Sequence, residues 1–173
     1  VPSAQHARLH TELGALPHID FAPHRFAAVH AAYVLSLLDG REIERSLCKM
    51  REWLQPEGKM FLSTFAPEGR RWGAFHATFQ ARCAAGLTWP GEISDVAALL
   101  AEAREVGSGP FHLLDVHTLS AAVARAGFTI EEVQSYAPPW DAAEVCCGIV
   151  ARLPRARPAR RRLSGRSVDS GCA

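Results

Sequence analysis

The sequence predicts an α/β fold in which parallel strands are followed by an antiparallel pair. Two patterns support this: a strand–helix–strand unit within residues 26–65, and a helix followed by two strands within residues 118–153. A crossover through one helix makes the flanking strands parallel. A length of 173 residues, 48% hydrophobic and 21% charged, suffices for one domain with its own core.

The first unit begins with an apolar run over residues 26–31, which is typical of a buried strand. From Arg41 onwards apolar residues recur every three or four positions, which predicts an amphipathic helix. Pro56 disfavours helical backbone in the residue before it, so this helix must end by Gln55. The next strand is expected over residues 59–65.

The second unit begins with a helix over about residues 118–126, capped by Asp115 or Thr118. Residues 128–136 alternate between polar and apolar and predict a strand. The apolar run over residues 145–153 predicts the last strand. Because the loop between these two strands is short, they are expected to be antiparallel.

Residues 66–116 are less regular and are expected to form a helical insertion or a cap over a substrate. Two helices are predicted there, over residues 71–85 and 96–106. Ser94 or Asp95 is expected to cap the second of them.

Composition excludes several classes of protein. No stretch approaches 18 consecutive apolar residues, so no transmembrane helix is expected. The five cysteines are irregularly spaced and contain no Cys-x-x-Cys pair, which argues against a disulfide framework or a zinc site and favours the reducing cytoplasm. His18, His24 and His30 are six residues apart, a spacing that suits neither face of a helix nor of a strand, so no metal site is expected.

The positive charge is concentrated at the C-terminus. Residues 152–173 hold seven of the 19 Lys and Arg residues but only one of the 18 Asp and Glu residues. We expect residues 154–173 to be a disordered, Arg-rich tail. Such a tail is either solvated without a partner or a tether for nucleic acid. The first interpretation is favoured, because no aromatic residue lies between the arginines to stack on bases.

Four segments in order resemble class I S-adenosylmethionine-dependent methyltransferases of the type 11-like group. Leu16-Pro17 with the following FAAVHAAYVL resembles the region of the family's fourth strand, and LQPEGKMFLS resembles the entry to the fifth. LSAAVARAGFTIEEV resembles the entry to the sixth strand, and residues 145–153 the seventh, antiparallel one. Two residues depart from the family pattern: Ala27 replaces an Asp, and Glu57 replaces the first Gly of a Pro-Gly-Gly turn.

The resemblance implies a partial Rossmann-like methyltransferase sheet. It covers about residues 10–153 and starts near the family's third strand, so residues 1–153 are expected to be a domain that lacks its first strands. The family's glycine-rich cofactor loop has no counterpart. The glycine-containing run over residues 106–109 does not fit, because it follows a helical pattern, whereas such a loop must follow a strand and open a helix. Residues 113–116 resemble the strand before such a loop, but His117 and Thr118 follow them in place of glycines. We therefore expect this chain to be a C-terminal fragment of a longer protein.

The resemblance also implies S-adenosyl-L-methionine as cofactor. Glu12 falls where the family has an Asp that accepts a hydrogen bond from the adenine amino group, and the backbone N–H of Leu13 would meet the adenine ring. His30, Ala31 and Ala32 close the fourth strand at the carboxyl edge of the sheet, where open parallel sheets bind ligands. The resemblance places the reactive methyl group beside this turn.

Tyr33, Trp72 and His76 are the candidate substrate contacts. His30 and His76 are also candidate bases, because imidazole titrates near neutrality. For each of these residues a structural role is the alternative. A small-molecule acceptor is expected, since residues 1–151 show no basic groove for nucleic acid.

Two other functions stay open at this point. A sheet without its first strands would expose an edge and a face, so the chain is alternatively a non-catalytic module whose exposed sheet is covered by a protein partner. The third possibility is nucleic-acid binding through the Arg-rich tail.

Overall fold

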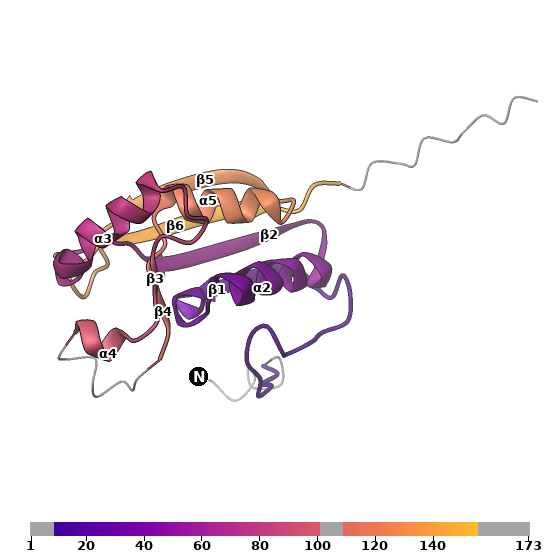
Figure 1. Cartoon of the computed structure of the whole chain (residues 1–173). Coiled ribbons are helices and arrows are strands. Elements are labelled where there is room, and N and C mark those ends of the chain that lie inside the picture. Colours follow the sequence, from indigo (N-terminus) through magenta and orange to yellow (C-terminus); the bar gives the residue numbers. More distant parts are fainter. Residues whose placement is uncertain (1–8, 101–108, 156–173) are drawn as a thin grey trace, which may run out of the picture.

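A computed structural model describes residues 9–100 and 109–155 of the chain (Figure 1). Its main sheet has four strands in the order β1-β2-β6-β5. β1 and β2 are parallel, whereas β6 is antiparallel to both of its neighbours. The predicted parallel unit and the predicted antiparallel pair are therefore both confirmed. The strands are β1 (Phe26–Ala32), β2 (Leu54–Phe65), β5 (Thr129–Tyr136) and β6 (Cys146–Arg152).

The crossover from β1 to β2 runs through a short 3-10 helix, η1 (Val34–Leu37), and helix α2 (Gly40–Trp53). Asp39 caps α2: its side chain accepts from the backbone N–H of Glu42 at 2.8 Å, and the Glu42 carboxylate accepts from the N–H of Asp39 at 3.1 Å. The helix ends at the residue before Leu54, as expected from Pro56 two positions later.

The second crossover helix is α5 (Val116–Arg125), which leads into β5. Asp115 is its cap, since its carboxylate accepts from the N–H of Thr118 at 2.8 Å. Thr118 lies inside the helix, so the alternative prediction that Thr118 caps it is wrong. Gly127 has a φ of 85° and ends the helix in the left-handed conformation that suits glycine.

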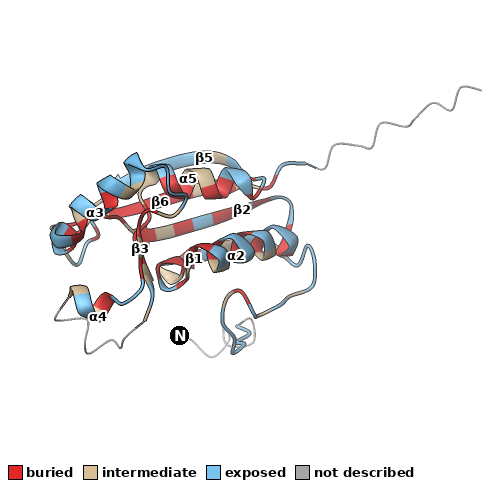
Figure 2. Ribbon diagram, viewed as in Figure 1, coloured by how far each residue is buried: buried red, intermediate tan, exposed pale blue. Residues whose placement is uncertain are grey.

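Both crossover helices pack on the same face of the main sheet. Side chains that alternate along the strands meet the apolar faces of α2 and α5 there, and Figure 2 shows this alternation along β2. The middle of the opposite face is open, with Phe61 37% exposed and His30 exposed beside it. The core on the covered face includes Ala31, Ile43, Leu47, Met50, Met60, Leu62, Leu119, Val123, Ile149 and Ala151.

The insertion lies at the end of the sheet where β2 finishes, on the left of Figure 1. The predicted helix over 71–85 is confirmed as η2 and α3, and Asp95 is confirmed as the cap of α4 through the N–H of Ala97. α4 ends at Leu99, and residues 101–108 of the predicted helix lie outside the described residues. The insertion comprises η2 (Arg70–Trp72), α3 (Gly73–Ala84), β3 (Glu92–Ile93), α4 (Val96–Leu99) and β4 (Phe111–His112).

The sequence pattern did not predict the two-stranded antiparallel sheet of β3 and β4 within this insertion. It forms because the chain returns very close to itself at Gly91. The Leu113 N–H donates to the Gly91 carbonyl at 3.0 Å, and a Cβ at Gly91 would overlap the Leu113 carbonyl oxygen at 1.8 Å. None of the helices formed by the described residues is long and apolar enough to cross a membrane.

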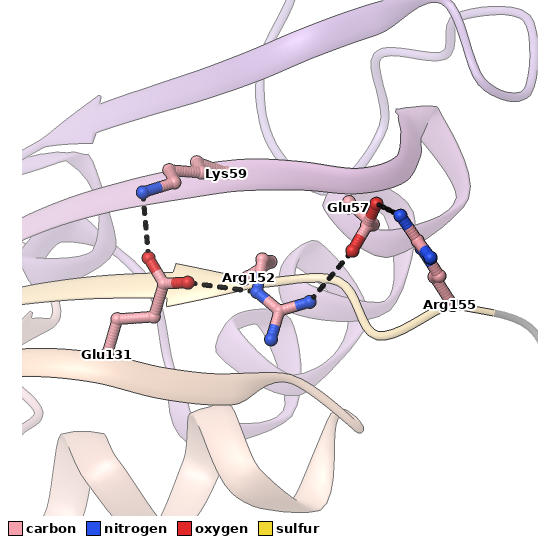
Figure 3. A network of polar contacts seen from close by, with 5 residues as sticks. All are labelled: Glu57, Lys59, Glu131, Arg152 and Arg155. Atoms are coloured by element: carbon pink, nitrogen blue, oxygen red, sulfur yellow. Dashed lines mark hydrogen bonds and ion pairs between the residues drawn. The ribbon is translucent and has the colours of Figure 1, made fainter.

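Glu57 occupies a turn at the start of β2 with a φ of 65°, a conformation that favours glycine. This is the position where the resembled family has a glycine. In Figure 3, Glu57 pairs with Arg152 at 3.4 Å and Arg155 at 2.8 Å, and Arg152 continues to Glu131. Lys59 also pairs with Glu131. The hydrogen bonds that Lys59 and Arg152 donate lower the pKa of the Glu131 carboxyl. The network lies at the amino end of β2, away from the carboxyl edge.

The steric cost of the Glu57 backbone can be separated from its ion pairs by two substitutions. Glu57→Ala keeps the strained φ and removes the ion pairs, which at this partly exposed site contribute less than about 1 kcal/mol each. Glu57→Gly removes the ion pairs and relieves the strain, so it should be about 1 kcal/mol more stable than the Ala variant in urea unfolding. An Ala variant as stable as the Gly variant would show that the turn is not strained.

His112 is fully buried, and in the folded protein its imidazole is neutral at neutral pH. Its Nδ1 contacts the Leu38 carbonyl oxygen at 3.3 Å, and Trp89 lies edge-on at 5.2 Å, while Nε2 has no partner among the described residues. Burial lowers the pKa of His112 from its ordinary value of 6.5 to about 4, although the Leu38 carbonyl and the nearby Asp39 oppose this.

The stability of the fold should therefore decrease as the solution is acidified. Between pH 6.5 and 4 the unfolded chain binds a proton at residue 112 that the folded chain excludes, so the free energy of unfolding should fall by up to about 3 kcal/mol over this interval. His112→Phe, which keeps a ring beside Trp89, should show a smaller slope. Urea unfolding at several pH values measures both proteins, and equal slopes would contradict the assignment.

Candidate functional site

The ends of four strands meet at one edge of the main sheet. β1 and β2 are parallel, so both finish there, and register places Tyr136 and Cys146 beside the last residue of β2, Phe65. In open sheets of this kind ligands bind outside the carboxyl ends of the parallel strands. We therefore take this edge, called the carboxyl edge below, as the candidate site.

Tyr33 directly follows β1 at the carboxyl edge and has an unusual backbone. Its φ of 61° and ψ of −5° are left-handed, which is an outlier for a bulky residue and costs about 1–3 kcal/mol. The surroundings hold it there: its N–H donates to the Ser63 carbonyl at 2.7 Å, and its ring lies 4.9 Å from that of Phe65. Such strain is common at ligand sites, because it aims a side chain that regular backbone would turn elsewhere.

The Tyr33 hydroxyl is hydrogen-bonded to the Tyr136 hydroxyl at 3.0 Å. Burial, the Tyr136 hydroxyl and the Cys146 thiol together raise the pKa of Tyr33 far above its ordinary value. Burial also raises the pKa of Cys146. Both groups are therefore protonated at neutral pH, so Tyr33 can donate or accept a hydrogen bond but cannot serve as a base.

The loop between β5 and β6 completes the edge. Trp140 in this loop is 62% exposed, with its ring edge-on to Tyr33 at 5.6 Å. Glu144, which is buried, fastens the loop to the insertion: one carboxylate oxygen accepts from the Trp72 indole at 3.2 Å, and the other pairs with Arg71 at 3.4 Å.

The structure brings four of the predicted residues to or near the carboxyl edge. His30 is exposed on the open face of the sheet, and Ala32 is exposed at the end of β1, directly before Tyr33. The side chain of Ala31 is buried in the core with α2, so only its backbone can face a ligand.

Glu12 and Leu13 are not brought into contact with these residues. Both are exposed, Leu13 fully, and neither makes a hydrogen bond or ion pair within the described part of the chain. After Leu13 the chain first packs against the core through Leu16 and Ile19. Asp20 then accepts from the Trp53 indole and pairs with Lys49 near the C-terminal end of α2. That is the amino end of the sheet.

The two predicted substrate contacts in the insertion differ in exposure. Trp72 is 3% exposed and stacks on Phe111 at 5.1 Å, so it supports the site through Glu144 and has little surface to offer a ligand. His76 is half-buried on α3, and its ring nitrogen is hydrogen-bonded to the Gln80 amide at 2.9 Å.

Sequence reasoning missed Tyr136, Trp140 and Glu144. A usable signal was present, because Tyr136 ends a predicted strand and the following Pro-Pro-Trp-Asp loop must begin at a strand terminus. The antiparallel position of β6 puts this loop at the same edge as Tyr33.

No family model matches the sequence, and no curated protein is similar to it in sequence. The structure, however, resembles solved S-adenosylmethionine-dependent methyltransferases. One from Methanosarcina mazei is 14% identical with a TM-score of 0.57, and the match covers 80% of this chain and 64% of the other. One from Mesorhizobium loti is 17% identical with a TM-score of 0.56 and coverages of 82% and 68%. This chain has the class I methyltransferase fold.

A third solved structure of this fold contains ligands. It is a 1,6-didemethyltoxoflavin-N1-methyltransferase from Burkholderia thailandensis with bound 1,6-didemethyltoxoflavin and S-adenosylhomocysteine. It is 15% identical with a TM-score of 0.53, and the match covers 79% of this chain but 47% of that protein. The chain thus spans between about half and two thirds of the lengths of these three structures.

Glu144 should be the main anchor of the loop that carries Trp140. Glu144→Ala leaves the buried Trp72 N–H without an acceptor, whereas the half-exposed Arg71 can be hydrated. We expect a loss of about 1–3 kcal/mol in the free energy of unfolding. Glu68→Ala, which removes an exposed carboxylate of the same insertion, should change it by less than about 0.5 kcal/mol. Urea unfolding of the two variants provides the comparison, and equal losses would argue against the anchor.

Proposed function

We propose that this chain takes part in S-adenosylmethionine-dependent methyl transfer to a small-molecule acceptor. The observation that carries the proposal is the carboxyl edge, where the parallel strands β1 and β2 end together and the strained Tyr33 presents its side chain. The shared fold with solved methyltransferases supports it. One of these has 1,6-didemethyltoxoflavin and S-adenosylhomocysteine bound.

The described residues fit part of the cofactor. The small side chains of Ala31 and Ala32 leave the end of β1 open to close approach, and Ala32 is exposed there. His30 beside them offers an imidazole on the open face. We keep Glu12 and Leu13 as contacts of the adenine, since both are exposed and have no other partner among the described residues.

The described residues do not fit the rest of the cofactor. Among the described residues no glycine-rich loop follows a strand and opens a helix, so nothing there is suited to the methionine end of the cofactor. Within the described residues β1 pairs with β2 alone, so its other edge is free there. We therefore propose that the chain acts as the C-terminal portion of a longer domain, and that further strands pair with β1.

The cofactor, when bound, supplies a methyl group on a positively charged sulfur. This chain's residues then have to orient the acceptor and keep water away. Tyr33, protonated and fixed by Tyr136, would orient the acceptor through a hydrogen bond. Trp72 would act indirectly, by holding the loop through Glu144, and His76 from α3 would contact larger acceptors. We place this activity in the cytoplasm, on the cysteine pattern alone.

A second candidate function is a non-catalytic module that binds a protein. The open face of the main sheet supports it, because a hollow of about 230 Å³ lies there between strands that no described helix covers. Together with the free edge of β1, this surface would suit a partner that adds a strand and covers the face. The hollow is lined by His30, Phe61, Ser63, Gln134, Tyr136 and Gly148.

Added bulk at the end of β1 should weaken cofactor binding without disturbing the fold. Ala32→Leu adds bulk at the carboxyl edge, and we expect it to weaken S-adenosylhomocysteine binding at least tenfold, about 1.4 kcal/mol, by isothermal titration calorimetry. Ala28→Leu is the matched control, because Ala28 is an exposed alanine of the same strand and face, nearer its amino end. It should bind as the unmodified protein does.

Two results would count against methyl transfer. One is equal weakening by the two leucine variants, which would mean that bulk on the sheet matters and not the carboxyl edge. The other is an absence of S-adenosylhomocysteine binding by the protein isolated from its native source at its full length. That second result would favour the protein-binding module.

A further inference from the structure

Trp140 at the carboxyl edge is exposed, although nothing in the packing of the fold calls for an exposed tryptophan there. Tryptophan usually buries most of its large apolar surface, yet this ring is 62% exposed. It is not loosely placed, because it lies edge-on to Tyr33 at 5.6 Å, and Tyr33 in turn contacts Phe65 at 4.9 Å. The indole is therefore a preformed apolar surface at the carboxyl edge.

The loop that carries Trp140 is bonded on both sides of it. The Asp141 N–H donates to the Pro138 carbonyl at 3.2 Å, and the Asp141 carboxylate accepts from the Ala143 N–H at 2.9 Å. Glu144 then ties the loop to Trp72. A ligand that stacks on Trp140 thus meets a surface that is already ordered, which reduces the entropy lost on binding.

The tyrosine pair beside Trp140 has hydrogen-bonding capacity to spare. Two phenols carry two O–H donors, and the 3.0 Å bond between Tyr33 and Tyr136 uses one of them. The other donor and several lone pairs remain for the Cys146 thiol and for a ligand. A flat apolar surface and a polar pair therefore lie side by side at the carboxyl edge.

We propose that Trp140 and the Tyr33–Tyr136 pair form the acceptor subsite, and that its acceptor is a planar aromatic molecule with a hydroxyl group. The aromatic ring would stack on Trp140, and the hydroxyl would bond to the tyrosine pair. As an acceptor subsite the assignment rests on the proposed methyl-transfer function. A binding site for such molecules would exist without it.

An ammonium ligand is the other class that binds an exposed indole, through cation–π attraction. The surroundings disfavour it. Arg70 and Arg71 lie beside the same loop, and the Arg70 N–H donates to the Ala143 carbonyl at 2.9 Å. Asp141 and Glu144 line the same hollow as these arginines, so the two guanidinium groups balance these two carboxylates and leave no excess of negative charge there to attract a cation.

The test is a ligand-observed NMR titration of the full chain without cofactor. Catechol is the aromatic probe, cyclohexane-1,2-diol has the same two hydroxyls without the aromatic ring, and tetramethylammonium represents the cations. We expect saturable binding of catechol and at least tenfold weaker binding of the other two. Trp140→Ala and Tyr136→Phe should each weaken catechol binding about three- to tenfold. Leu87→Ala, which removes another exposed apolar side chain, should leave it unchanged.

Three results would overturn the proposal: equal binding of catechol and cyclohexane-1,2-diol, preferred binding of tetramethylammonium, or unchanged catechol binding by Trp140→Ala. A dispersed amide spectrum of each variant shows that it is folded, so a loss of binding cannot be attributed to unfolding. Because no cofactor is present, this outcome is independent of the S-adenosylhomocysteine titration. Catechol binding without S-adenosylhomocysteine binding would retain the aromatic site and reject methyl transfer, and the reverse would reject the aromatic site alone.

Discussion

The parallel pairing of β1 and β2 is the constraint on which the rest of the structure depends. It follows from the length of the connection, since a chain that passes through η1 and α2 returns to the amino end of the sheet before β2 begins. Both strands must then finish at one edge. The three aromatic side chains of the proposed acceptor subsite, Tyr33, Tyr136 and Trp140, reach that edge either at the end of a strand or in the loop before β6.

The two faces of the sheet differ in how far the described helices cover them. α2 and α5 both pack on one face, and their apolar side chains form a single core with the strands. The other face has little cover at His30 and Phe61. A sheet with parallel strands is normally covered on both faces. The open face, with the edge of β1 that has no partner strand among the described residues, is therefore the surface on which we propose that additional polypeptide packs, from the same protein or from a partner. Both proposed functions, methyl transfer and protein binding, involve such additional polypeptide.

The insertion contributes to the site by fixing its walls. Trp72 of η2 stacks on Phe111 of β4, and Phe65 at the end of β2 packs against Phe111, so a second small core is continuous with the carboxyl edge. The buried Glu144 transmits this rigidity to the loop of Trp140. The exposed indole can therefore be held in place without being covered.

Local sequence patterns were enough to predict the elements of the main sheet, both crossover helices and the order in which they occur. Local signals were strong there: apolar periodicity in α2, alternation in β5, and end signals at Asp115 and Gly127. The resemblance in those segments also led to the correct fold. Local pattern carries no information on strand order or on register. The tertiary structure, through both, brings Tyr136 and Trp140 beside Tyr33, which is 103 and 107 positions away in the chain. It also decided that Trp72 and Ala31 turn their side chains inward, since burial depends on what packs against a residue and not on the residue alone.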